Sequence, residues 1–303
     1  MPEKSKIGRW IKTAVADVLV VTALYFLVKY LVGNWYQIVP HLQDIRPGYV
    51  IAASVPTLLV LLLSSWGWTL IMRWLGVPLG GWLGFQLYYQ SSIFRYLPGS
   101  LWYLPGRGIL CQRQGISLSL FGKSAFLELF FLLAAAGMLG GIAVAVRYEW
   151  AWLSAASLAT FLGMIAVVVF QKHFRRLVLW KSELDSAPRA GVVWIILTYI
   201  GAWCMYGASL NLLLVALGIP VQSVWDGLYV TSAGVAAWMI GFLSFVPTGL
   251  GIREASLVSL LQPIAPAYYV IVLGLVQRSL EILLEGGLWC VILAKRLLSP
   301  KSA

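Results

Sequence analysis

The sequence has little charge, and acidic residues are the scarcest class. Only 11% of the 303 residues are charged and 60% are hydrophobic, whereas an ordinary soluble protein is about 25% charged and about 45–50% apolar. These proportions exclude a disordered chain and almost every soluble globular enzyme. The 11 Asp and Glu stand against 22 Lys and Arg. The positive excess indicates membrane topology and contact with lipid headgroups, and no nucleic-acid partner is expected, because the apolar stretches are too long.

Cysteine and histidine are also rare. Cys111, Cys204 and Cys290 lie far apart, and no pair has the spacing of a metal or redox site. Both histidines, His41 and His173, fall in polar connectors. We therefore expect no metal, no cofactor and no histidine-based catalysis inside the membrane, and a transporter is expected rather than an enzyme.

Long apolar stretches dominate what is present. A helix that spans the hydrocarbon core needs about 20 mostly apolar residues. Six stretches meet this requirement, and the sequence predicts spanning helices over 10–32, 48–72, 119–145, 150–171, 191–217 and 266–294.

Two further apolar segments, 82–118 and 222–265, are interrupted by proline and glycine. The first contains FRYLPGSLWYLPGRG (94–108) and the second FLSFVPTGLGIRE (242–254). Proline removes a helical donor and glycine permits positive φ. Broken backbone at membrane depth is tolerated only where protein buries it or where it lines a wet cavity, so both breaks are candidate parts of a functional site.

Lysine and arginine placement predicts the topology. The N-terminus, the connector 172–190 and the C-terminal tail are all basic, so all three belong on the cytoplasmic face of the inner membrane. This holds only if 82–118 and 222–265 each enter and leave by one face, as re-entrant hairpins. The prediction is an all-α polytopic protein with one transmembrane domain over 1–303. Its halves, about 10–145 and 150–294, form an inverted-topology repeat, as in many secondary transporters.

The first interrupted segment concentrates arginine. It holds Arg95, Arg107 and Arg113, and no acidic residue occurs between 74 and 127. Guanidinium forks beside glycine N–H groups suit a phosphate. The alternative is that some of them anchor the segment to lipid headgroups at the interface. Trp102, between two Pro-Gly breaks, is a candidate to line a lipid path.

The second interrupted segment and the last helix add paired charges. Arg253 and Glu254 follow the glycines, and Arg278, Glu281 and Glu285 share one helix face. Two interpretations stay open: Arg278 and Glu281 form a structural ion pair, or the acids balance the arginines or couple transport to protons.

Glu128 lies deep in the helix after the first interrupted segment. It is a candidate either to titrate or to pair with one of the arginines before it. The predicted substrate-binding residues are Arg95, Pro98, Gly99, Trp102, Arg107, Arg113, Glu128, Pro247, Gly249, Gly251, Arg253, Glu254, Arg278 and Glu281.

The two interrupted segments also carry motifs that resemble a known family. Leu97-Pro98-Gly99, Arg113 and Gly115-Ile116-Ser117 match its first motif, and Pro247, Gly249-Leu250-Gly251 and Arg253-Glu254 match its second. The chain thereby resembles the lysylphosphatidylglycerol synthase transmembrane-region family, also called flippase-like membrane proteins. Thr248 stands where that family usually has Gly, and Pro105-Gly106 adds a second break to the first segment.

The resemblance implies a protein that moves lipids between leaflets. The cargo would be a polyprenyl-phosphate-linked sugar or an anionic or aminoacylated phospholipid. Lysyl transfer is not expected, because the chain lacks a soluble aminoacyl-transferase domain. The alternatives are a membrane-embedded enzyme acting on a lipid phosphate and a non-catalytic partner of a glycosyltransferase.

Overall fold

The computed structural model describes residues 45–92, 103–179, 190–244, 249 and 251–298. Over these residues the chain forms helices and connecting turns, without a strand. The helices are α3 (Pro47–Trp74), α4 (Gly81–Ser92), α5 (Tyr103–Arg113), α6 (Leu118–Arg147), α7 (Ala151–Val169), α8 (Gln171–Leu179), α9 (Ala190–Ala216), α10 (Val224–Leu243), α11 (Ile252–Leu261) and α12 (Ala267–Leu298).

Local sequence explains where the helices around the site begin. The Ser117 hydroxyl accepts a hydrogen bond from the Leu120 N–H at the start of α6. At the start of α10, Ser223 Oγ accepts from the Asp226 N–H while the Asp226 carboxylate accepts from the Ser223 N–H, both at 3.1 Å. These caps satisfy donors that a helix N-terminus otherwise leaves open.

Six described helices are long and apolar enough to span a membrane, so the chain is a membrane protein. Five of them match the stretches predicted from 48 to 294, and the sixth is α10 (Val224–Leu243), which the sequence predicted as one arm of a hairpin. The predicted helix over 10–32 lies outside the described residues.

The described residues of each interrupted segment form two helices. Helices α4 and α5 flank the first break and contact each other, and α10 and α11 do the same at the second. The structure corrects the prediction that 172–190 is only a polar connector, because its first part belongs to α8, whose Arg175 lies over the Trp74 ring.

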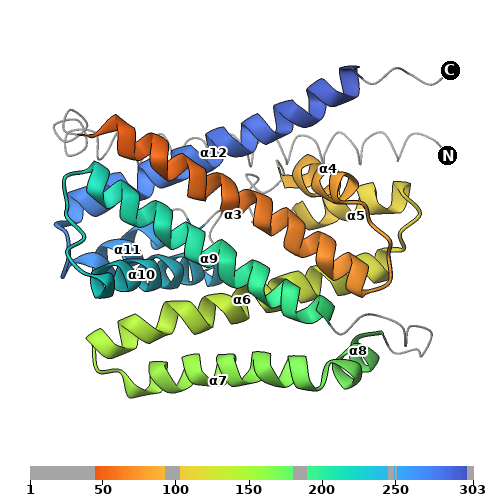
Figure 1. Ribbon diagram of the computed structural model, residues 1–303, viewed down its shortest axis with the longest axis horizontal. Helices are drawn as coiled ribbons and strands as arrows, with labels where there is room; N and C mark the ends of the chain where they lie inside the picture. Colours follow the sequence, from red (N-terminus) through yellow and green to blue (C-terminus); the bar gives the residue numbers. More distant parts are fainter. Residues whose placement is uncertain (1–44, 93–102, 180–189, 245–248, 250, 299–303) are drawn as a thin grey trace, which may run out of the picture.

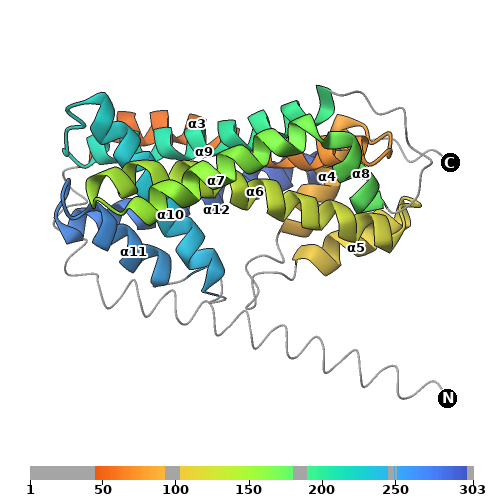
Figure 2. The same ribbon diagram turned by 90° about the horizontal axis from the view of Figure 1, so that it is seen from below.

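Helices α3 and α9 pack extensively against each other and run antiparallel side by side (Figure 1). The Arg46 N–H before α3 bonds to the Ala216 carbonyl at the end of α9. Helix α3 contacts α4, α6 and α12, while α9 contacts α10, α12 and α6. Helices α4 and α5 lie at one end of the molecule, and α11 lies at the other (Figure 2).

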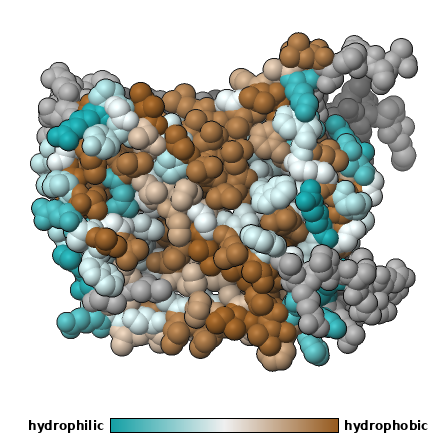
Figure 3. All heavy atoms as spheres, in the orientation of Figure 1, coloured by the Kyte–Doolittle hydropathy of each residue, from teal (hydrophilic) through white to brown (hydrophobic). Residues whose placement is uncertain are grey.

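Hydrophobic residues cover the middle of the face seen in Figure 3, and hydrophilic residues gather at its left and right margins, where the helices end. Many large apolar side chains remain exposed, among them Ile51, Trp152 and Leu283. Such a surface suits hydrocarbon rather than water.

Candidate functional site

A cavity of about 210 Å³ lies between α3, α4, α5, α6, α9, α10, α11 and α12. This is smaller than the roughly 300–1,000 Å³ of pockets that enclose a drug-sized ligand, so it suits a headgroup rather than a whole lipid. Its charged lining residues are Glu128, Arg253, Arg278, Glu281 and Glu285. Half of its other lining residues are aromatic, namely Tyr88, Tyr89, Tyr103, Tyr199, Trp203, Tyr206, Trp238 and Phe242.

Arg253 enters the cavity from the first turn of α11. A Cβ on Gly241 would lie 2.9 Å from the Arg253 Cβ, so glycine in α10 lets α11 approach closely. The Arg253 guanidinium donates to Tyr206 Oη at 2.8 Å and to Glu281 Oε1 at 3.3 Å. The side chains of Arg253 and Glu281 are 12% and 27% exposed, so this ion pair faces the cavity.

A second ion pair ties α12 to the start of α11. Arg278 donates to Glu254 Oε1 at 2.8 Å, and Glu254 Oε2 accepts from the Gly251 N–H at 2.8 Å. The alternative that Arg278 pairs with Glu281 along one helix face is wrong, because each of these residues bonds a partner on α11 instead. Helix α11, which packs against α12, brings both partners within reach.

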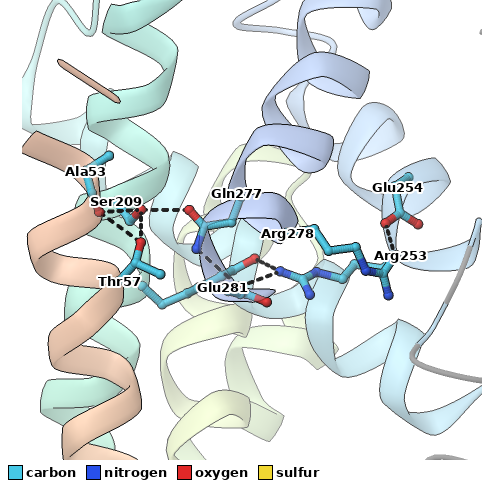
Figure 4. Close-up of polar contacts among 9 residues, drawn as sticks. Ala53, Thr57, Ser209, Arg253, Glu254, Gln277, Arg278 and Glu281 are labelled. Atoms are coloured by element: carbon cyan, nitrogen blue, oxygen red, sulfur yellow. Dashed lines mark hydrogen bonds and ion pairs between the residues drawn. The ribbon is translucent and has the colours of Figure 1, made fainter. Parts of the chain in front are cut away.

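A chain of buried polar side chains leads from α3 and α9 to Glu281 (Figure 4). The hydroxyls of Thr57 and Ser209 are 2.7 Å apart, and Ser209 donates to Gln277 Oε1 at 2.6 Å. Gln277 Nε2 then donates to Glu281 Oε1 at 3.1 Å. Thr57, Ser209 and Gln277 are all buried, and sequence analysis missed them because single polar residues in apolar helices carry no distinctive pattern.

Arg107 lies outside the cavity lining, fully buried behind it. It donates to Glu128 Oε2 at 2.7 Å and to Ser91 Oγ at 3.2 Å. Its guanidinium lies 4.0 Å from the centre of the Tyr88 ring and 5.0 Å from that of Trp68. Glu128 was a candidate either to titrate or to pair with an arginine. In the structure it pairs with Arg107 of the first interrupted segment.

The other predicted residues fall into three groups. Arg113 is exposed at the end of α5, away from the cavity lining. Gly249 lines the cavity at φ 67°, and Gly251 has φ 79°. The remainder lie outside the described residues, namely Arg95, Pro98, Gly99, Trp102 and Pro247. Among the described residues, no group of three or more His, Cys, Asp or Glu side chains is arranged to hold a metal ion.

Comparison with known families matches residues 10–284 to the lysylphosphatidylglycerol synthase TM region. The chain belongs to this family. The match covers the two interrupted segments and every charged residue of the cavity except Glu285. This family is consistent with a lipid-related membrane protein, in agreement with the apolar surface. No curated protein matches the chain.

Proposed function

We propose that this protein moves the headgroup of a phosphate-containing lipid across the membrane through the central cavity. The observation that carries the proposal is a pair of arginines, Arg253 and Arg278, on a headgroup-sized cavity among apolar helices. The cargo class is a polyprenyl-phosphate-linked sugar or an anionic or aminoacylated phospholipid. The hydrocarbon chains stay in the bilayer, because the cavity has room only for the headgroup.

The chemistry of the lining supports this cargo. A guanidinium presents a fork of donors that matches phosphate oxygens, and charged hydrogen bonds are stronger in a site that excludes water. Glu281 and Glu254 balance the two arginines while the cavity holds no anion. The aromatic wall offers ring faces to a sugar or to an amine beside the phosphate.

We further propose that both interrupted segments are re-entrant hairpins and that the two halves of the chain form an inverted repeat. At the second segment, Tyr229 near the start of α10 donates to the Leu260 carbonyl near the end of α11, which supports entry and exit by one face. The helix contacts support the repeat. In the proposed repeat, α3, α4, α5 and α6 of the first half correspond to α9, α10, α11 and α12 of the second. Within the halves, the contacts α3–α4 and α5–α6 then correspond to α9–α10 and α11–α12. Between the halves, the contacts α6–α10 and α6–α9 correspond to α12–α4 and α12–α3, and all of these pairs are in contact.

The test is a leaflet assay in liposomes. Purified protein is reconstituted with a fluorescent polyprenyl phosphate, its sugar-linked form or fluorescent phosphatidylglycerol, and an impermeant quencher reports the exposed fraction over time. We expect transfer of at least one lipid. Arg253→Met should slow transfer at least about tenfold, since a hydrogen bond to a charged group contributes about 1.5–3 kcal/mol.

Arg113→Met is the matched control, because Arg113 is exposed outside the cavity, and we expect it to transfer at the wild-type rate. Wild-type rates equal to those of protein-free liposomes for all three lipids would contradict the proposal. A chemically altered lipid would favour the enzyme alternative. Transfer that requires an added glycosyltransferase would favour the role of a partner protein.

A further inference from the structure

The two ion pairs between α11 and α12 differ in how tightly each carboxylate is held. Glu254 is 6% exposed and uses both oxygens, one on Arg278 and one on the Gly251 N–H. Glu281 is 27% exposed, lines the cavity and reaches Arg253 at the longer distance of 3.3 Å. Glu281 is therefore the carboxylate that an incoming anion meets and the one that is more easily displaced.

The buried polar chain gives Glu281 a second donor. Because Ser209 donates to Gln277 Oε1, the Gln277 amide is oriented with its NH₂ group toward Glu281. Gln277 Nε2 and Arg253 reach the same Glu281 oxygen, Oε1. A carboxylate that leaves Arg253 thus keeps a hydrogen bond, which lowers the free energy of the displaced state, because an unsatisfied buried charge is costly.

We infer that Glu281 is a displaceable counterion of Arg253, and that Thr57, Ser209 and Gln277 are positioning residues that hold it ready to return. A headgroup phosphate takes the place of the Glu281 carboxylate on the Arg253 guanidinium, and the return of Glu281 expels the phosphate. The inference rests on the proposed function and adds a residue that sets both affinity and release.

An internal competitor has a measurable signature. The apparent affinity for the phosphate is the intrinsic affinity multiplied by the fraction of time that the Arg253 guanidinium is free of Glu281. If the Arg253–Glu281 pair is closed about nine-tenths of the time, its removal tightens the apparent Kd about tenfold. Release then slows, because no carboxylate returns to the guanidinium.

The test measures binding of a short-chain prenyl phosphate to detergent-purified protein, and transfer of its fluorescent long-chain form in liposomes. We expect Glu281→Gln to bind about tenfold more tightly and to transfer more slowly at saturating lipid. Glu285→Gln is the matched control, since Glu285 lines the cavity one helical turn further along α12. It removes the same charge, and its effect on Kd should be much smaller.

A second variant covers the case in which Glu281→Gln fails to fold. Gln277→Met keeps every charge but removes the Nε2 donor that stabilises the displaced Glu281 carboxylate, so the pair is more often closed, and we expect weaker binding than in the wild type. Equal tightening by Glu285→Gln and Glu281→Gln would overturn the inference, as would unchanged or tighter binding by Gln277→Met. Absence of binding to the wild-type protein would instead contradict the proposed function, so the two failures are distinguishable.

Discussion

At the scale of single residues, Arg107 and Glu128 show how a charge is held inside this bundle. Arg107 is fully buried, its partner Glu128 is almost so, and the ring of Tyr88 covers the guanidinium plane. Removing one partner of such a pair typically costs about 3–5 kcal/mol, because the other charge is left uncompensated. Glu128→Met should therefore lower the thermal midpoint of the detergent-solubilised protein substantially.

The matched control for this prediction removes both charges together. A protein with Arg107→Met and Glu128→Met leaves neither charge of this pair without the other, so its thermal midpoint should lie well above that of Glu128→Met alone. If both proteins melt at the same temperature, Arg107 and Glu128 do not act as a unit, and the pair does not stabilise the bundle in the way described here.

Sequence reasoning predicted which charged residues lie deep, but not how they pair. Arginine and glutamate at membrane depth are rare enough to be noticed one by one. Their partners depend on helix packing: Arg278 bonds Glu254 across to α11, although Glu281 is nearer in sequence and on the same face. Ser209 and Gln277 are 68 positions apart in the chain, so nothing local indicates that they meet.

At the scale of helices, the turn between α10 and α11 depends on two glycines with different constraints. Gly249 and Gly251 both have positive φ, which costs a residue with a side chain about 1–2 kcal/mol. A Cβ on Gly249 would also lie 3.0 Å from the Gly241 backbone, whereas a Cβ on Gly251 would meet nothing within 4 Å. We therefore expect Gly249→Ala to lower the thermal midpoint more than Gly251→Ala.

Gly251→Asn refines this comparison, because asparagine tolerates positive φ better than alanine. Its thermal midpoint should lie between those of wild type and Gly251→Ala. If Gly249→Ala and Gly251→Ala are equally stable, the close approach of Gly249 to Gly241 contributes nothing measurable.

The helices were the most predictable part of the fold, because apolar length is read directly from the sequence. Proline and glycine also predicted the interruptions between α4 and α5 and between α10 and α11. The predicted second break at Pro105-Gly106 is wrong, because both residues lie in the first turn of α5, where a helix tolerates proline. The sequence was less informative about α8, because this helix is basic and lacks a long apolar stretch. Helix α8 forms in a basic stretch that looked like a connector, because its Phe174 packs against the core and its Arg175 lies over Trp74.

At the scale of the whole molecule, basic residues from different helices lie at the membrane face where α3 ends and α4 begins. Arg175 lies over the ring of Trp74 at the end of α3, and Lys295 of α12 lies over that of Trp82 at the start of α4. At the opposite face, Tyr148 after α6 donates to the Ser259 carbonyl of α11. These contacts agree with a topology in which each interrupted segment returns to the face it entered.

Cysteine labelling in intact cells tests this topology. In a protein without its native thiols, Gly80→Cys and Gln114→Cys flank the first interrupted segment, and Gln222→Cys and Gln262→Cys flank the second. Gly80 has open space for a side chain and the three glutamines are exposed, so each thiol reaches the reagent. An impermeant reagent should label the second pair from outside and the first pair only after the membrane is opened. Members of one pair that label from opposite faces would mean that this segment crosses the membrane. The basic α8 or the C-terminal end of α12 would then lie outside, against the positive-inside pattern.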